Sequence, residues 1–239
     1  MNRAGSLTFK FLSSLIILHP AASIAQDFGS STHDSMIYTG INLAKYNSVY
    51  YSGYLTPFEG SKLANGYVHR FAADYMTYHY TDGSTKVTAS APALGYSAGY
   101  RKTTDHYSLG AYLGMQNRYT LLSPGEVHNT EKGNKTSAAV TFESRLNLNN
   151  SQAALWAGGY ASDSNYWTRA RYQIGSSIIT GPELLIQGNS NFRSNQYGWF
   201  VGNFNVGHDW RAMFNLGYST NNGTDSPFSG GMSLYKYFD

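Results

Sequence analysis

The feature that most constrains this sequence is an alternation of apolar and polar side chains with a period of two residues, which recurs through nearly the whole chain. Residues 165–174 illustrate it. Tyr166, Tyr172 and Ile174 share one face of an extended strand, and Arg169 and Arg171 share the other. Runs of this kind end in clusters of Gly, Asn, Asp or Ser, which predicts half-buried β-strands. Apolar residues at helical spacing are scarce, so we expect an all-β fold.

The alternation predicts twelve strands, most of them long enough to cross a bilayer at a tilt, for which about 9–11 residues are needed. The expected ranges are 35–46, 48–57, 66–80, 86–102, 106–121, 135–149, 152–161, 165–174, 179–189, 195–206, 209–220 and 228–238. Pro92 predicts a bulge or a shorter strand in the fourth range, because proline cannot donate to a ladder. The connections are expected to alternate between tight turns and longer loops, the longest being residues 122–134.

Two all-β architectures are compatible with this pattern, a secreted soluble β protein and an antiparallel up-and-down transmembrane β-barrel. The mean hydropathy of −0.38 does not exclude the barrel, because only every second residue of a barrel strand faces lipid. Aromatic residues make up 15% of the chain and cluster near strand ends, as at residues 50–51, 199–200 and 235–238. Such clusters suit two interfacial belts. We therefore expect a transmembrane barrel of about twelve strands.

The beginning of the chain has the layout of a secretory signal peptide. Arg3 and Lys10 supply a positive start, residues 11–18 form a short apolar run, and small residues at 23 and 25 form a cleavage site. We expect export by a Sec-type route and cleavage near Ala25. The expected organisation is a signal peptide at residues 1–25, a short periplasmic segment at 26–34 and a barrel at 35–239, in the outer membrane of a Gram-negative bacterium.

Composition excludes several classes of function. The chain has no cysteine, which excludes a disulfide scaffold, a Cys-ligated zinc site and a lipid anchor after the signal. Lys and Arg number 17 against 14 Asp and Glu, without a basic cluster, so no nucleic-acid partner is expected. The aromatic content and the low share of charged residues exclude a disordered chain. We expect neither a metal nor a cofactor.

Charged residues within the strands indicate which face points inward. An arginine that faces lipid near the membrane midplane costs about 2–4 kcal/mol, so the face with Arg169 and Arg171 is expected to line the lumen. Other strand charges follow the same argument, and aromatic residues are assigned by their parity. The predicted luminal set is Arg70, Asp74, Glu143, Arg145, Trp156, Tyr160, Trp167, Arg169, Arg171, Glu183, Trp199 and Arg211, with Tyr197 on the same expected face as Trp199.

Three functional interpretations of this lumen stay open. Arg–carboxylate pairs that satisfy one another would close the pore, and the barrel would be structural or adhesive. Arginine forks and aromatic faces could instead guide a hydroxyl-rich or anionic chain through a narrow polar channel. The third interpretation is an outer-membrane hydrolase of lipid or glycan, because His106 and Ser108 share a strand face. No G-x-S-x-G or H-E-x-x-H motif supports this enzyme.

Several motifs resemble the cellulose biosynthesis protein BcsS family. The sequence RARYQIG at 169–175 is followed by GPE at 181–183, NFR at 191–193 and Gly198. The opening YTG at 38–40 with the later Gly53 also looks similar. The long loop with LSP at 122–124 and the later Gly133 leads into an Ala- and Glu-containing strand at 138–145, as in that family.

The resemblance implies a non-enzymatic accessory of cellulose or related exopolysaccharide production in Gram-negative bacteria, and it brings no catalytic residues with it. The expected partners are outer-membrane lipid, a polysaccharide chain and the components that secrete it. Glu183 and Arg169 become the positions of most interest, because they lie both in the matching motifs and on the predicted luminal face.

Overall fold

The computed structural model describes residues 33–45, 47–82, 84–124, 132–161, 165–188, 193–221 and 224–239. The signal peptide expected at 1–25 lies outside these residues, as do most of the segment at 26–34 and part of the loop at 122–134. No helix of the described residues is long and apolar enough to cross a membrane.

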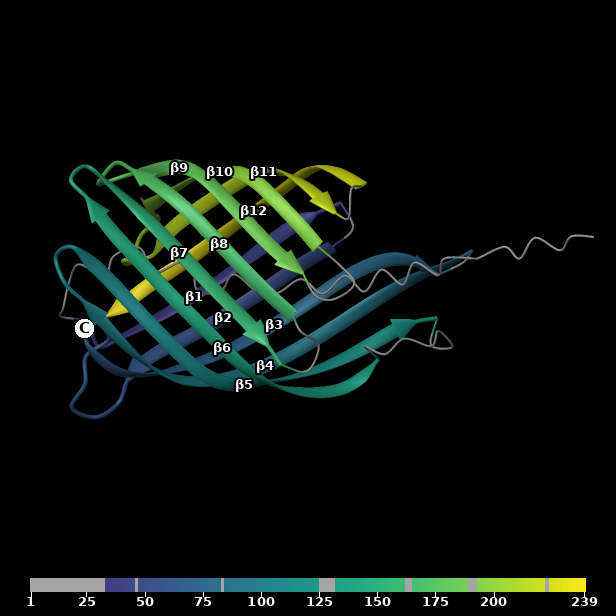
Figure 1. Ribbon diagram of the computed structural model, residues 1–239, viewed down its shortest axis with the longest axis horizontal. Coiled ribbons are helices and arrows are strands. Elements are labelled where there is room, and N and C mark those ends of the chain that lie inside the picture. The colour runs from purple at the N-terminus through teal and green to yellow at the C-terminus, as the bar shows by residue number, and fades with distance from the viewer. Residues whose placement is uncertain are drawn as a thin grey trace, which may run out of the picture.

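The described residues form twelve antiparallel strands that close into one barrel (Figure 1). In chain order the strands are β1 (Ser35–Ala44), β2 (Asn47–Pro57), β3 (Gly66–Asp82), β4 (Thr85–Thr103), β5 (Tyr107–Ser123), β6 (Gly133–Leu148), β7 (Ser151–Tyr160), β8 (Asn165–Ile174), β9 (Ile179–Gly188), β10 (Arg193–Asn205), β11 (Arg211–Asn221) and β12 (Thr224–Phe238). Each strand pairs with its neighbours in sequence, and β1 pairs with β12 over ten residue pairs from Ser35–Phe238 to Ala44–Ser229. The predicted up-and-down barrel of about twelve strands is confirmed.

The connections differ from the expected alternation of tight turns and longer loops. At the end where Ser35 pairs with Phe238, the gaps between strands are residues 58–65, 104–106, 149–150, 175–178 and 206–210. At the opposite end they are residues 45–46, 83–84, 124–132, 161–164, 189–192 and 222–223. Residues 124–132 remain the longest gap, the gap at residues 58–65 at the other end is nearly as long, and the remaining gaps are short at both ends. The long strands β3 to β6 project beyond their neighbours at the opposite end instead (Figure 1).

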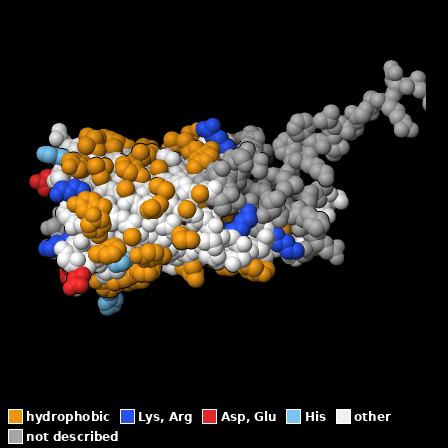
Figure 2. Space-filling model, turned by 60° about the horizontal axis from the view of Figure 1, so that its bottom comes forward, with side chains coloured by type: hydrophobic (Ala, Val, Ile, Leu, Met, Phe, Trp, Pro, Cys, Tyr) orange, Lys and Arg blue, Asp and Glu red, His pale blue; other side chains and the backbone are white. Residues whose placement is uncertain are grey.

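The outer wall of the barrel is apolar. Large hydrophobic side chains such as Leu94, Leu113 and Leu216 are more than 60% exposed on it. In the face that Figure 2 shows, apolar side chains are spread over the wall, whereas charged and His side chains gather towards the two ends. A surface of this kind is unfavourable in water, and its exposed area is suited to acyl chains.

Outward-facing tyrosines mark the two borders of this apolar wall. On β5, Tyr107 and Tyr119 are 38% and 48% exposed, with Leu113 midway between them. At about 3.3 Å per residue and a tilt of about 45°, the strand from Tyr107 to Tyr119 rises about 28 Å, close to the thickness of a hydrocarbon core.

Several aromatics that the sequence assigned to these belts face the lumen instead. Within each expected cluster only alternate residues point outward, as the pleat requires. Tyr50, Trp199 and Phe238 are exposed. The buried members are Tyr51, Phe200 and Tyr235.

Pro92 neither shortens β4 nor shifts its register. The ladder between β4 and β5 pairs Ser90 with Leu121 and resumes at Ala93 with Arg118, so only the pairs at 91 and 92 are missing. Arg118 donates through Nη1 to the carbonyl oxygen of Ala91 at 3.1 Å. A luminal side chain thus satisfies a backbone group that the proline leaves without its ladder partner.

The outward face of β5 gives a direct test of its lipid contact. We expect Leu113→Arg to lower the free energy of unfolding by about 2–4 kcal/mol, because this residue lies midway between the two tyrosine borders. Urea unfolding of the barrel in lipid vesicles measures the change. The matched control is Leu43→Arg, whose site is exposed near the end of β1 and should cost at most about 1 kcal/mol. Equal costs at the two sites would contradict a membrane-embedded wall.

Candidate functional site

Charged residues predicted to line the lumen are buried inside the barrel. The side chains with 9% or less of their surface exposed are Arg70, Asp74, Glu143, Arg145, Arg169, Arg171 and Glu183, together with Trp156 and Trp167. Tyr160 is partly buried and packs against Ala154, Trp156 and Trp167. Arg211 is partly buried and donates to Asn203 Oδ1 at 3.4 Å, near the end at which the termini pair.

Trp199 and Tyr197 do not face the lumen, and their prediction is wrong. They are 55% and 56% exposed on the outer wall, whereas Phe200, one residue further on, is fully buried. Trp199 Nε1 donates to Thr180 Oγ1 at 2.7 Å across the outer face. β10 has aromatics on both faces and no charge in its middle, so its sequence carries no residue that fixes the parity.

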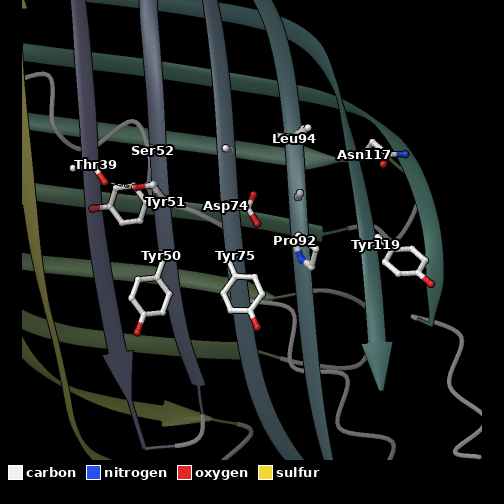
Figure 3. Close-up of a pocket in the computed structure, with 12 residues that line it drawn as sticks. Thr39, Tyr50, Tyr51, Ser52, Asp74, Tyr75, Pro92, Leu94, Asn117 and Tyr119 are labelled. Carbon is white, nitrogen blue, oxygen red and sulfur yellow. Dashed lines mark hydrogen bonds between the residues drawn. The ribbon is translucent and has the colours of Figure 1, made fainter. Parts of the chain in front are cut away.

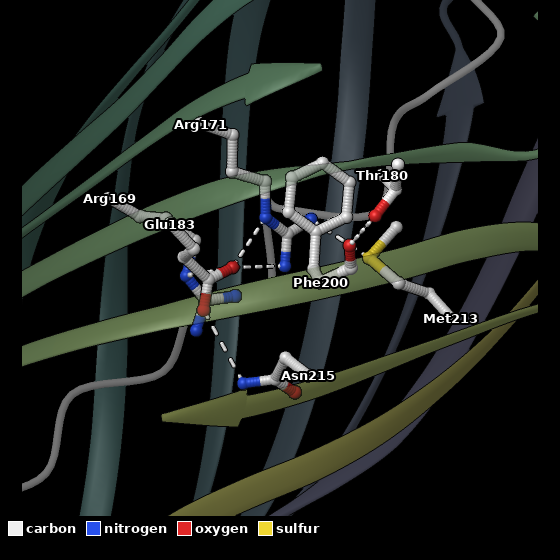
Figure 4. Close-up of polar contacts among 7 residues, drawn as sticks. All are labelled: Arg169, Arg171, Thr180, Glu183, Phe200, Met213 and Asn215. Carbon is white, nitrogen blue, oxygen red and sulfur yellow. Dashed lines mark hydrogen bonds and ion pairs between the residues drawn. The ribbon is translucent and has the colours of Figure 1, made fainter. Parts of the chain in front are cut away.

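One cluster of contacts is built around Glu183, and we call Arg169, Arg171, Glu183 and Asn215 the Glu183 cluster. Figure 4 shows both arginines of β8 converging on Glu183 of β9, with Asn215 of β11 donating from the other side. Arg169 Nε lies 3.6 Å from Glu183 Oε2, and Asn215 Nδ2 lies 3.4 Å from Oε1. Arg171 donates to Glu183 from Nε and pairs with it through Nη2.

Arg171 is also held by residues that carry no charge. Its Nη1 contacts Met213 Sδ at 2.9 Å. Its guanidinium carbon lies 4.6 Å from the ring centroid of Phe200 and 5.8 Å from that of Trp156. Cation–π contacts of this kind offset part of the cost of removing a guanidinium from water.

The other half of the lumen contains a second set of charges on β3 to β6. Arg70 Nη1 and Arg101 Nη2 lie 3.8 and 3.6 Å from the carboxylate oxygens of Glu143. Asp74 pairs with Arg118 at 3.0 Å and accepts a hydrogen bond from Gln116 at 3.1 Å. We call Arg70, Arg101 and Glu143 the Glu143 cluster.

Buried side chains occupy the middle of the barrel. Tyr51 of β2 and Trp167 of β8 have only 5% and 1% of their surface exposed. Because β2 and β8 are on opposite walls, the middle of the lumen is filled by side chains rather than left as a wide channel.

The filled lumen has a surplus of positive charge. Among the described residues, Arg70, Arg101, Arg118, Arg145, Arg169 and Arg171 face three buried carboxylates, Asp74, Glu143 and Glu183. Guanidiniums stay protonated in proteins. Glu143 and Glu183 therefore each pair with two arginines, and the buried guanidiniums outnumber the buried carboxylates.

Glycines make room for luminal aromatic rings. A Cβ at Gly53 would come within 2.2 Å of the ring of Tyr38, and one at Gly40 within 2.5 Å of the ring of Tyr51. The two tyrosines come from neighbouring strands, with ring centroids 6.5 Å apart. The YTG motif with its later glycine is thus a packing unit of the lumen.

Sequence reasoning missed several luminal residues. Arg101 and Arg118 lie on β4 and β5, and the cost of a lipid-facing arginine could have identified both of them. Nothing in a single sequence indicates that Met213 and Phe200 contact Arg171, because these contacts join strands that are distant in the chain.

The Ser–His pair required for a hydrolase is not formed. Ser108 is buried with its Oγ 2.9 Å from Thr103 Oγ1. His106 lies in the turn before β5 and contacts Thr104 and Asn147 through its backbone. No group of three or more His, Cys, Asp or Glu side chains among the described residues is placed to hold a metal ion.

A separate hollow of 590 Å³ lies against the outer wall of β1 to β5. Its floor has small residues such as Ser52 and Ala73, and Figure 3 shows the rings of Tyr50 and Tyr75 side by side, with Tyr119 beyond Pro92. The rings of Tyr50, Tyr75 and Tyr119 are exposed on the outer wall, whereas Tyr51 and Asp74, which also line the hollow, have buried side chains. The hollow therefore opens onto the lipid-facing surface.

The Glu183 cluster predicts a large loss of stability on removal of its carboxylate. We expect Glu183→Gln to lower the free energy of unfolding by about 3–5 kcal/mol, because two buried guanidiniums lose their counter-charge. The control Glu59→Gln changes an exposed carboxylate between β2 and β3 and should stay within about 0.5 kcal/mol. Urea unfolding in vesicles compares them, and similar values would show that the cluster is not a stabilising contact.

The glycine and tyrosine packing makes a second prediction. We expect Gly53→Ala to lower the free energy of unfolding by about 1–3 kcal/mol, because the new methyl group must displace the ring of Tyr38. Gly95→Ala is the control, since its Cβ would approach no atom closer than 3.5 Å. Chemical denaturation of both variants measures the difference, and an equally stable Gly53→Ala barrel would refute the packing.

The sequence matches the model of one protein family, and the fold is similar to that of several solved barrels. The model of a family described as cellulose biosynthesis protein BcsS matches residues 36–238. None of the curated proteins matches the sequence.

Two solved barrels are similar in fold. LpxR from Salmonella typhimurium has a TM-score of 0.51 at 7% identity, over 85% of this chain and 100% of that one. The translocator domain of the autotransporter NalP from Neisseria meningitidis has a TM-score of 0.51 at 9% identity, over 87% of this chain and 90% of that one. At these identities the likeness concerns the fold alone.

Proposed function

Because the chain belongs to the cellulose biosynthesis protein BcsS family, we propose that it assists the production of cellulose or a related exopolysaccharide as a non-enzymatic barrel of the outer membrane. Side chains of its narrow polar lumen bind and guide the polymer. The Sec-type signal at residues 1–25 exports the chain, and residues 35–239 then form the barrel in lipid. The partners are outer-membrane lipid, the polysaccharide chain and components of its secretion.

The observation that carries this proposal is the surplus of buried arginines beside aromatic rings in the lumen. Arg169 and Arg171 share Glu183, and Arg70 lies 5.6 Å from the ring centroid of Tyr112. Guanidinium forks bind hydroxyl and carboxylate oxygens, and aromatic faces provide apolar surfaces on which sugar rings stack. A hydroxyl-rich chain therefore finds both kinds of contact within the lumen.

The main competing function is a structural or adhesive barrel without transport. The filled lumen favours it, because Arg–carboxylate contacts and buried rings such as Tyr51 already occupy the interior. In the proposed function these contacts are a constriction that exchanges for contacts with the polymer. The two proposals therefore differ in whether the luminal charges matter once the barrel has folded.

A triple variant separates these functions. Changing Arg169, Arg171 and Glu183 to Leu replaces the charges of the cluster as a unit, and such replacements are often neutral for stability. We expect a folded barrel with heat-modifiable gel mobility, and polymer export that falls to the level of cells lacking the protein. Export at the wild-type level from the folded triple variant would contradict the luminal function.

The hydrolase alternative is tested at Ser108. We expect Ser108→Ala to leave polymer export unchanged, because its hydroxyl serves as a hydrogen-bond partner of Thr103. Loss of export in this variant, with the barrel folded, would favour a Ser-dependent enzyme.

A further inference from the structure

A cavity of 620 Å³ lies at the end of the barrel where the two termini pair, separate from the ion-pair clusters. Its size is within the range of about 300–1,000 Å³ that ligand pockets occupy. Amide and hydroxyl side chains dominate its lining, among them Asn147, Asn149, Asn150, Gln152, Ser176 and Asn203. We call this cavity the amide mouth.

Three amide side chains form a row along the inner wall beside this mouth. Asn147 on β6 is directly opposite Gln152 on β7, and Gln152 is directly opposite Gln173 on β8. All three share the parity of buried luminal neighbours such as Arg145 and Trp156. Because adjacent strands lie about 4.8 Å apart, the row presents a series of evenly spaced donors and acceptors.

Two acceptors in this row lack partners. Asn147 Nδ2 donates to the carbonyl oxygen of Asp105 at 2.6 Å. Its Oδ1 is buried and has no hydrogen-bond partner within the described part of the chain, and the same is true of Gln173 Oε1. Of the two residues, Asn147 lines the amide mouth, so a ligand there that complements its Oδ1 must bring a hydrogen-bond donor.

This requirement selects the chemistry of the ligand. A hydroxyl group donates one hydrogen bond and accepts others, whereas an ionised carboxylate or phosphate only accepts. Among the described residues that line the cavity, Asp105 carries the one charge, which is negative. The neighbouring Arg211 donates to the lining residue Asn203. The amide mouth is therefore complementary to a neutral ligand rich in hydroxyl groups.

We propose that the amide mouth is a binding site for a neutral, hydroxyl-rich glycan, at the entrance to the lumen. The proposal rests on the luminal function above and goes beyond it, since it assigns a site outside the arginine clusters and chooses a neutral chain over an anionic one. Asn147 and Gln152 bind the sugar hydroxyls there, and the arginines lie deeper in the barrel.

The test is calorimetric titration of the full-length mature barrel in detergent. The neutral probe is cellohexaose, and the anionic probe is a hexamer of galacturonic acid. We expect measurable binding of cellohexaose and weaker binding of the acid. Asn147→Leu and Gln152→Leu should each weaken cellohexaose binding about three- to tenfold, as expected for the loss of one or two hydrogen bonds.

Gln187→Leu is the matched control. Gln187 is also a buried luminal glutamine with an unpartnered Oε1 among the described residues, but it lies near the opposite end of β9. Its replacement should leave binding unchanged. Heat-modifiable gel mobility verifies that each variant is folded. Asn147 also donates a hydrogen bond to the carbonyl oxygen of Asp105, between β4 and β5. Gln152→Leu tests the site without removing that contact.

Three results would overturn the site: no binding of cellohexaose by the folded wild type, binding of the acid that is equal or stronger, or the same loss in Gln187→Leu as in Gln152→Leu. The luminal function has its own readout, polymer export by the triple variant. If cellohexaose does not bind but the triple variant loses polymer export, the binding site at the amide mouth is refuted and the luminal function stands.

Discussion

The burial of guanidiniums away from lipid is the constraint on which the rest of this structure depends. An arginine on the lipid side of a strand costs about 2–4 kcal/mol near the midplane. β8 has two arginines, Arg169 and Arg171, on the same face. Both point into the barrel and share Glu183. Once this face is fixed, the pleat directs Tyr166, Tyr172 and Ile174 towards the membrane.

The same constraint shapes the interior of the barrel. Arginines that must lie inside need counter-charges and rings, and strands beyond their immediate neighbours supply some of them, as Glu143 and Tyr112 do for Arg70. Glycines at positions such as Gly53 admit the rings of luminal tyrosines. A twelve-stranded barrel, wide enough for a channel, is thereby narrowed in its middle, while polar amides remain at the mouth where the termini pair.

The fold could be predicted from the sequence because alternation and membrane cost act within single strands. Strand number, closure and the inward face of β8 all follow from local patterns. The face of β10 could not be predicted, because Trp199 and Phe200 place aromatics on both sides. Phe200 and Met213 reach Arg171 from strands that are not adjacent to β8, and the amide row depends on the register between β6, β7 and β8. A single sequence contains neither kind of information.

The central claim is that successive residues of each strand alternate between two surroundings. One residue contacts acyl chains, and the next faces an enclosed interior. The chain has no cysteine, so single cysteines can be introduced along β8 and labelled with a fluorophore after folding into vesicles of brominated lipid. The account predicts strong quenching at Thr168, Ala170 and Tyr172, and weak quenching at Gln173, whose side chain is buried inside. Uniform quenching, or none at any of these positions, would contradict it.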